Sequence, residues 1–496
     1  MAKNKKSSAS PAARIISLVL RVVLSAVLLG VTAGLMWLIV QLGVLPPMYR
    51  NIIFGVIIVI DLILLLCQVT NKARILSKIL MVIMSAVLLL GSIALNSMLS
   101  TMHAVSSDTE TVDMMAVYVM TDDSAQSLSD AAEYNFGILK LLDRSNTDGC
   151  IEQIKEDLSA DITTTEFDSP LALANALQAG EVNAMIMNTA YMGLIEDQEG
   201  YESFSQQLRQ IWSCEFRRTL SDSEQNQQSD SRPITERPFI LYVSGNDTSG
   251  TLQSTGRSDV NILMAINPKT HEILMVNTPR DYFVPLSVSG GEKDKLTHAG
   301  IYGVDVSMDA LSTLYGVPVE YYARLNFTGF QKIIDALGGI TVESPKAFRS
   351  NDGRYFSKGT NELNGAEALS FARERYAFGE GDNQRGKNQM TVIRAVIDKA
   401  SSPAILTGYL DVMEAASGTF QTNMSQDEIS SLVQMQLSDG TGWNIQSIAV
   451  SGEGSMGPCF SMPTDNVWRM IPNDDDVANA STQLKAFLAE QPYTAD

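Results

Sequence analysis

The sequence predicts an α/β protein in which three transmembrane helices precede a small α/β domain and then an α-β-α sandwich with a mixed central sheet. Two observations carry this prediction. Apolar residues are concentrated in the first hundred residues, and the rest alternates short strand-like and helix-like segments. The hydrophobic share is 45% and the charged share only 19%, whereas soluble proteins carry about 25% charged residues. The 496 residues suffice for more than one domain, since a domain takes ~100–200 residues.

Charge and rare residues exclude several classes of function. The 36 Lys and Arg against 56 Asp and Glu give a net charge of −20, so no nucleic-acid partner is expected, because such partners require basic patches. Three His and four Cys cannot support a zinc-rich or densely disulfide-bonded fold.

Three apolar runs open the chain, at Ile15–Val44, Ile52–Val69 and Ile79–Leu99, with Pro46 and Pro47 breaking the first from the second. Each reaches the ~20 residues that cross a bilayer. The first run is too long for a signal peptide and lacks a small-residue cleavage site. We therefore predict three transmembrane helices within residues 15–100.

Basic residues predict the orientation of these helices. They occur in the tail 1–14 and in the loop between the second and third runs, as Lys3, Lys5, Lys6, Arg14, Lys72, Arg74 and Lys78. The tail is therefore expected in the cytoplasm and everything after about Ser100 outside, in a multi-pass protein of the cell membrane. Asp61 lies within the second run, where an acid is costly. It either serves a function or is buried against a neighbouring helix.

Residues 104–220 have the pattern of a small extracellular α/β domain, called here the accessory domain. We expect strands at Met114–Met120 and Ala184–Asn188, and helices at Ser129–Leu142, Ile151–Leu158 and Pro170–Ala179. Cys150 and Cys214 lie on the oxidising side of the membrane, where they either pair or remain thiols. Cys459 would then be left free.

A polar linker at 221–238 leads into a second globular unit, which we place at 239–490. Its strands are expected at Phe239–Ser244, Val260–Asn267 and Glu272–Thr278, the last two forming a hairpin. Its helices are expected at Asp305–Tyr315, Phe327–Leu337, Gly365–Phe371 and Asp382–Lys399.

Charged residues gather in five short stretches of this unit: Ser244–Asp247, Gly256–Asp259, Thr278–Asp281, Phe371–Tyr376 and Gly379–Met390. Three of them adjoin strand ends, where ligand sites of open α/β sheets occur. In an extended segment Arg373 and Arg375 point to one side and Glu374 to the other, provided that the preceding helix ends near Ser370.

Arg385 and Gln389 share one face of the last predicted helix, and Asp382 stands near its N-terminus. Several arginines suit phosphate, and acids beside phosphate require a bridging cation such as Mg²⁺. The pattern thus predicts a divalent-metal–pyrophosphate site. The alternative is that each Arg–Asp pair is a surface ion pair of ~0–1 kcal/mol. His271 is expected to be solvated, whereas His298 either lines the site or is structural.

The order of these motifs, from SGND through GRSD, NTPRDYFV and KLTHAG to FARERYAFGEGDNQRGKNQ, resembles the LytR–CpsA–Psr family of bacterial envelope phosphotransferases. The resemblance covers about Phe239–Ala400. Three membrane spans and an extra domain resemble the capsule-type members. The family transfers a glycopolymer, such as teichoic acid or capsule, from an undecaprenyl-pyrophosphate carrier in the membrane to peptidoglycan through a phosphodiester. Residues 239–490 are thus expected to be the catalytic domain.

The resemblance also implies roles for single residues. Asp247 and Asp259 match ligands of Mg²⁺ (or Mn²⁺), and Asp382 matches a further acid near the metal. The arginines and the amide match pyrophosphate contacts at Arg257, Arg280, Arg373, Arg375 and Gln389, with Arg385 a weaker candidate. The sequence departs from the family at Asn383–Gln389, and Gly386, which costs ~1 kcal/mol inside a helix, favours a helix start later than Asp382.

Two other functions remain open at this stage. The same residues suit a lipid-pyrophosphate hydrolase with water as acceptor. A non-catalytic envelope regulator or polymer-binding module is the other alternative. Because Asp247, Asp259 and both paired arginines are present, we favour an enzyme.

Overall fold

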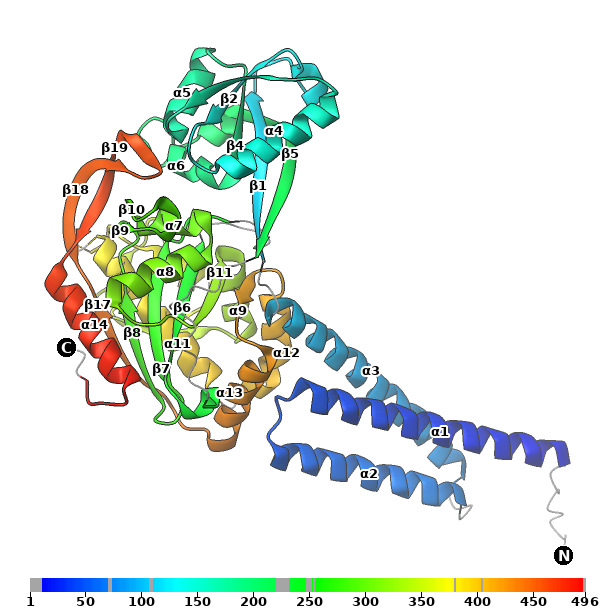
Figure 1. The fold of residues 1–496 in the computed structure, drawn as a ribbon. Coiled ribbons are helices and arrows are strands. Elements are labelled where there is room, and N and C mark those ends of the chain that lie inside the picture. The colour runs from blue at the N-terminus through cyan, green and yellow to red at the C-terminus, as the bar shows by residue number, and fades with distance from the viewer. Residues whose placement is uncertain are drawn as a thin grey trace, which may run out of the picture. The chain divides into compact units, whose positions relative to one another are not determined.

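The computed structural model describes residues 11–69, 74–106, 110–219, 232–246, 252, 255–378, 381–402 and 405–493. The chain forms two compact units. One comprises residues 1–103 with 425–440, and the other comprises residues 104–424 with 441–496. The first unit contains the apolar helices, and the second contains the two larger sheets (Figure 1).

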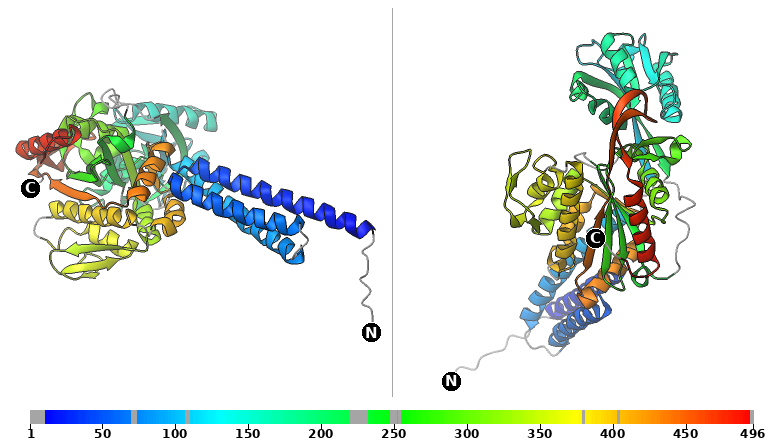
Figure 2. Two further views of the ribbon diagram at one scale, coloured as in Figure 1. Left: turned by 90° about the horizontal axis from the view of Figure 1, so that it is seen from below. Right: turned by 90° about the vertical axis from the view of Figure 1, so that its left-hand side faces the viewer.

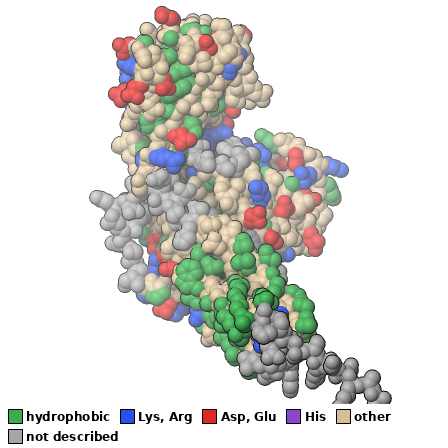
Figure 3. Space-filling model, turned by 90° about the vertical axis from the view of Figure 1, so that its right-hand side faces the viewer, with side chains coloured by type: hydrophobic (Ala, Val, Ile, Leu, Met, Phe, Trp, Pro, Cys, Tyr) green, Lys and Arg blue, Asp and Glu red, His purple; other side chains and the backbone are tan. Residues whose placement is uncertain are grey.

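The first unit is built from α1 (Pro11–Leu42), α2 (Pro47–Val69), α3 (Arg74–Ser106) and α13 (Gln426–Asp439). The segments Ile15–Leu42, Pro47–Gln68 and Ile75–Met102 are long and apolar enough to cross a membrane. Hydrophobic side chains cover their surface (Figure 3). The three predicted spans are therefore confirmed as apolar helices.

Asp61 of α2 is buried within this unit and 3% exposed. The Thr32 hydroxyl on α1 donates to its carboxylate at 2.8 Å. Asp61 thus joins two helices, which matches the second of its two sequence interpretations. Helix α13 belongs to the same unit, since the Ser430 hydroxyl donates to the Leu42 carbonyl at 3.0 Å.

The accessory domain is a five-stranded mixed sheet in the order β3-β2-β4-β1-β5. Its strands are β1 (Glu110–Met120), β2 (Asn135–Leu139), β3 (Thr163–Phe167), β4 (Ala184–Asn188) and β5 (Leu208–Thr219). Its helices are α4 (Arg144–Leu158), α5 (Pro170–Ala179) and α6 (Met192–Glu196). The thiols of Cys150 and Cys214 lie within hydrogen-bonding distance of each other, and both are free.

The helix predicted over Ser129–Leu142 is wrong. A short 3-10 turn at Leu128–Ala131 is followed by strand β2, which pairs in parallel with β3 and β4. A Cβ on Gly137 would lie 2.4 Å from the Leu173 side chain, so β2 and α5 pack in close contact. A short apolar run fits a helix or a buried strand equally well, and the sheet decides between them.

The larger domain contains a six-stranded sheet in the order β16-β11-β6-β7-β8-β17. Its strands are β6 (Phe239–Asn246), β7 (Val260–Asn267), β8 (Glu272–Asn277), β11 (Tyr321–Asn326), β16 (Phe420–Thr422) and β17 (Asn444–Ala449). Strand β6 is parallel to β11 and antiparallel to β7, and the β7–β8 hairpin is present. The predicted mixed sheet is confirmed.

Helices cover both faces of this sheet. They are α7 (Leu296–Tyr302), α8 (Val304–Tyr315), α9 (Phe327–Ala336), α10 (Gly365–Arg373), α11 (Asp382–Ala400), α12 (Ile405–Ala416) and α14 (Asp474–Leu488). Short strand pairs complete the domain: β9 (Phe283–Pro285) with β10 (Lys293–Lys295), β12 (Ile340–Ser344) with β15 (Gly359–Leu363), β13 (Phe348–Arg349) with β14 (Tyr355–Phe356), and β18 (Gly452–Cys459) with β19 (Met462–Pro472).

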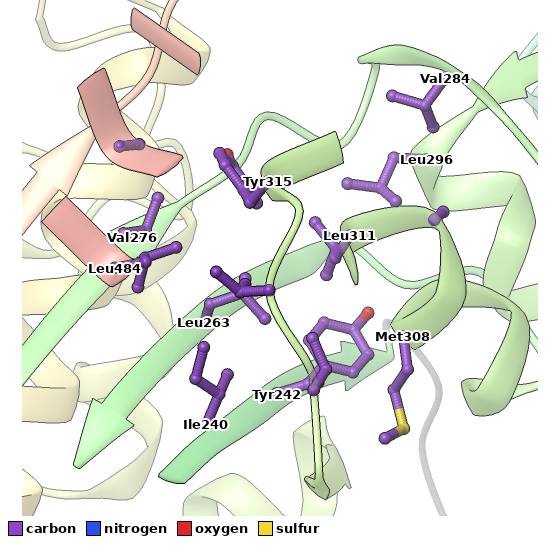
Figure 4. Packing of buried hydrophobic residues seen from close by; sticks show 14 of the residues in the cluster. Ile240, Tyr242, Leu263, Val276, Val284, Leu296, Met308, Leu311, Tyr315 and Leu484 are labelled. Carbon is purple, nitrogen blue, oxygen red and sulfur yellow. The ribbon is translucent and has the colours of Figure 1, made fainter. Parts of the chain in front are cut away.

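The central strands are buried on both faces, and successive side chains alternate between two cores. Tyr242, Leu263 and Val276 pack with α8 and α14 on one face (Figure 4). Met264 and Met275 pack with Met390 of α11 on the other. The right-hand view of Figure 2 shows α14 and α11 on opposite sides of the sheet.

Two helix boundaries differ from the sequence expectation. Helix α10 continues to Arg373, three residues beyond the expected end at Ser370. Helix α11 begins at Asp382 and includes Gly386, so the glycine does not delay the helix.

Candidate functional site

The register of the sheet brings the polar strand ends to one edge. Strand β6 ends at Asn246, and the antiparallel β7 begins at Val260 opposite Gly245. Asp259 directly precedes β7, and its backbone N–H donates to the Gly245 carbonyl at 2.8 Å. The parallel strand β11 ends beside β6, with Asn326 opposite Asn246.

Arg280 reaches the same edge from β8. Strand β8 runs antiparallel to β7 and ends at Asn277, so the residues after it return toward Asp259. Nη1 of Arg280 lies 2.8 Å from Oδ1 of Asp259, and the Thr297 hydroxyl donates to the same oxygen at 3.3 Å. The Arg280 and Asp259 side chains are 15% and 16% exposed. The pair is therefore shielded from solvent.

These arginines keep Asp259 ionised. Burial by itself raises the pKa of Asp259, but Arg280 and Arg257 outweigh burial and lower the pKa to about 2. Burial likewise lowers the pKa of Arg280, and the two acids Asp259 and Asp281 reverse this and raise it. The site therefore contains a carboxylate and guanidinium groups that remain charged at any physiological pH.

The end of α10 presents two further arginines. Glu374 is extended and 2% exposed, and its carboxylate accepts backbone N–H groups from Asn351, Tyr376 and Ala377 at 2.7–2.8 Å. With Glu374 held by this turn, Arg373 and Arg375 both line one cavity. The Arg373 guanidinium also lies 4.5 Å from the ring centre of Phe327. The two arginines reach the same cavity although the helix ends later than expected, and Glu374 lines that cavity as well.

Helix α11 contributes Arg385 and Gln389 to the same cavity. Its approach to the sheet depends on Gly386, where a Cβ would lie 2.1 Å from Nδ2 of Asn277. The amide of Asn388 donates to the Phe371 carbonyl at 3.2 Å and so ties α11 to α10. A glycine that is unfavourable for the isolated helix thus allows the contact that places two polar side chains in the cavity.

The cavity has a volume of about 800 Å³ and combines a polar end with an apolar wall. Seven of the nine predicted site residues line it: Arg257, Asp259, Arg280, Arg373, Arg375, Arg385 and Gln389. Its apolar lining comes from the strands, α9, α10 and α11, and includes Val243, Met264, Leu325, Phe330, Ile333, Leu369, Val392, Ile393, Val396 and Ile397. Asp247 lies outside the described residues, and Asp382 is described only as the first residue of α11.

The oxygen donors at the polar end suit a hard cation. Asn246 is 2% exposed and lines the cavity, and its Oδ1 has no hydrogen-bond partner among the described residues. A buried acceptor left unpaired costs free energy unless a ligand satisfies it. Together with the ionised Asp259 it offers two oxygens, the ligand type that Mg²⁺ and Mn²⁺ prefer. The residues present therefore fit a divalent cation.

The histidines lie elsewhere. His298 is 2% exposed, and its Nδ1 lies 2.7 Å from Asp294 and 2.9 Å from the Ser461 hydroxyl. This buried network does not line the cavity. The ring centres of His271 and Trp443 lie 5.2 Å apart. His271 is therefore partly covered by Trp443, whereas the sequence predicted a solvated side chain.

Sequence reasoning missed three contributors to the cavity. Asn246 carries no signal beyond its place at a strand end, and the apolar face of α11 reads as ordinary core. Asp197 comes from the accessory domain and also lines the cavity. Its position sixty residues before Arg257 gives no indication of this contact.

The chain is similar to proteins of a known family. The model of the LytR_cpsA_psr family matches residues 212–486, more than half of the chain. The chain belongs to the LytR_cpsA_psr family. The family match includes the strands, helices and arginines that form the cavity.

Curated relatives in this family are named as transferases. The polyisoprenyl-teichoic acid–peptidoglycan teichoic acid transferase TagU of Bacillus anthracis is 30% identical over 289 residues, which cover 58% of this chain and 90% of TagU. The same-named protein of Oceanobacillus iheyensis is 30% identical over 259 residues, 51% of this chain and 76% of that protein. Among solved structures, TagV of B. subtilis is 28% identical with a TM-score of 0.43 and covers 52% of this chain and 99% of TagV.

Proposed function

We propose that this chain is a membrane-anchored phosphotransferase that moves a glycopolymer from an undecaprenyl-pyrophosphate carrier to peptidoglycan. The product is a phosphodiester, and the reaction depends on Mg²⁺ or Mn²⁺. The single observation that carries the proposal is the cavity, which is lined by six arginines, an ionised Asp259 and many apolar side chains. The named activity of the TagU relatives supports the same reaction class.

Both parts of the donor match the cavity. A pyrophosphate diester carries two negative charges, and guanidinium groups bind its oxygens with paired hydrogen bonds. The prenyl chain requires an apolar surface, which the side chains of α9 and α11 provide. The three apolar helices anchor the chain in the membrane that contains such a carrier.

The reaction requires positioning and charge stabilisation more than covalent catalysis. The acceptor hydroxyl oxygen attacks the phosphorus that carries the sugar, and the bond from that phosphorus to the bridging oxygen breaks. Undecaprenyl phosphate leaves with the bonding electron pair, and the hydroxyl proton passes to solvent. Arg257, Arg280 and Arg373 neutralise charge on the two phosphates. Asp259 and Asn246 would hold the cation, which when bound adds positive charge at the phosphate oxygens.

The placement of the protein follows from its basic residues. Because Lys and Arg gather in the tail and the second loop, we place the N-terminus in the cytoplasm and the cavity outside, where peptidoglycan is built. The partners are then the lipid-linked polymer, peptidoglycan and the membrane, without nucleic acid.

The test uses the full chain in liposomes with a lipid-pyrophosphate-linked radiolabelled sugar, a peptidoglycan oligomer and Mg²⁺. Label should enter the peptidoglycan, and Arg373→Ala and Asp259→Asn should each lower the rate about 100-fold or more. Asp398→Asn on the exposed side of α11 and Arg349→Ala outside the cavity are the matched controls and should retain the rate. Free sugar phosphate without attachment would instead identify a hydrolase. Donor binding without turnover would identify a binding module.

A further inference from the structure

The accessory domain contacts the segment that carries Arg257. Asp197 follows α6, and its Oδ2 lies 2.5 Å from Nη1 of Arg257. The same nitrogen donates to the Gly193 carbonyl on α6 at 3.2 Å. The two side chains of the ion pair are only 13% and 28% exposed, for Arg257 and Asp197 respectively. The guanidinium side of this contact is therefore largely buried, whereas Asp197 reaches it from an exposed position.

The lack of a side chain at Gly193 allows this contact. A Cβ at this position would lie 2.8 Å from Nε and 2.9 Å from Cζ of Arg257. The guanidinium therefore lies directly against the backbone of α6. A side chain of any size at residue 193 would push the guanidinium away.

Further contacts hold the same short segment from both sides. The Thr255 hydroxyl donates to Asp113 of β1 at 3.0 Å, and its backbone N–H donates to the Val112 carbonyl at 3.3 Å. On the other side, the Gly256 N–H donates to the Gly300 carbonyl of α7 at 3.3 Å. Residues 255–257 thus lie between the accessory domain and α7.

We propose that Gly193 and Asp197 form a seat that positions Arg257 for the donor's pyrophosphate, so that the accessory domain is a working part of the donor site. The Gly193 carbonyl and the Asp197 carboxylate both contact Nη1 of Arg257. The seat therefore holds one end of the guanidinium at a fixed place, and Arg257 also lines the cavity. Asp197 is a positioning residue that acts through Arg257. The inference rests on the proposed function for the identity of the ligand.

The opposite role for Asp197 predicts the opposite result. If Asp197 stood in for the donor phosphate and had to be displaced, its removal would tighten donor binding. Several contacts hold residues 255–257 in place. They favour a fixed position for Arg257 over a contact with Asp197 that the donor must displace. The sign of the change in KM separates the two roles.

The experiment measures transfer kinetics of the full chain in liposomes for Asp197→Asn and Gly193→Ala. Both variants should raise the KM for the lipid-linked donor about five- to tenfold, since contacting charges couple by such amounts, and should change kcat less than twofold. Asp197→Glu should recover part of the loss. Glu199→Gln removes an exposed charge two residues away and is the matched control. In the Arg257→Lys background, Asp197→Asn should have less than half its effect.

A second readout does not depend on transfer. Binding of geranylgeranyl pyrophosphate is measured by calorimetry with Mg²⁺ and no acceptor, and melting temperatures confirm that each variant is folded. Weaker binding by Asp197→Asn supports the seat even if the wild-type protein transfers nothing, an outcome that would refute only the proposed transferase. Unchanged or tighter binding by folded Asp197→Asn would overturn the inference while leaving the proposed function intact.

Discussion

Replacing Gly386 by alanine should show whether the close approach of α11 to Asn277 matters more than the helix propensity of residue 386. In an isolated helix the change is favourable by about 1 kcal/mol, since alanine is the better helix former. In this protein the new Cβ would lie 2.1 Å from Nδ2 and 2.8 Å from Cγ of Asn277. Carbon atoms in contact normally stay about 3.5 Å or more apart. Asn277 is 5% exposed, so its amide has little room to turn away.

The size of the effect follows from this distance. Helix α11 must move outward by about 1.4 Å to restore normal contact, and Arg385 and Gln389 move with it. Overpacking of this kind costs about 1–3 kcal/mol, which exceeds the gain in helix propensity by up to about 2 kcal/mol. Displacing binding groups by about 1 Å costs about 100-fold in rate. We therefore expect a modest loss of stability together with a large loss of transfer.

The assay compares the transfer rate and the melting temperature of full-length Gly386→Ala with those of Gly442→Ala, where a Cβ meets nothing within 4 Å. The control should match the wild-type protein in both measurements. A Gly386→Ala protein that is more stable than wild type and fully active would refute the reasoning. In that case Asn277 turns aside, and the close approach of α11 does not place the polar side chains.

Three further outcomes are expected. Glu374→Ala leaves three backbone N–H groups without their carboxylate, so denaturant unfolding should show a loss of about 2–4 kcal/mol, unlike an exposed control such as Glu362→Ala. The pKa of Asp259 is about 2 against its ordinary 3.8, so its charge stabilises the fold above pH 4 and this stability is lost as the pH falls toward 2. Asp259→Asn should flatten that part of the pH–stability curve; an unchanged slope would contradict the pairing with Arg280. Burial raises the pKa of Asp143 to about 7, so its contribution to stability declines as the pH rises from about 4 to 7. Asp143→Asn should raise the melting temperature at pH 8 but not at pH 4.

The sequence alone determined the features that are local or carried by residue type. Lengths of apolar residues fix membrane helices because a bilayer sets the required span. Short continuous runs of apolar residues predict β7 and β8, and the motifs identify the arginines and acids that adjoin strand ends. The hairpin pattern also implies the antiparallel register that brings Arg280 back to Asp259.

Tertiary structure decided what depends on contacts between distant segments. Strand β2 is a strand because β3 and β4 pair with it, although its spacing also fits a helix. Glycine suits position 386 inside a helix because Asn277 lies directly against it. Asp197 reaches Arg257 because the accessory domain packs against the larger domain. A contact energy of this kind depends on which surfaces meet in space. Residue spacing along one chain does not contain that information, so only the folded protein reveals it.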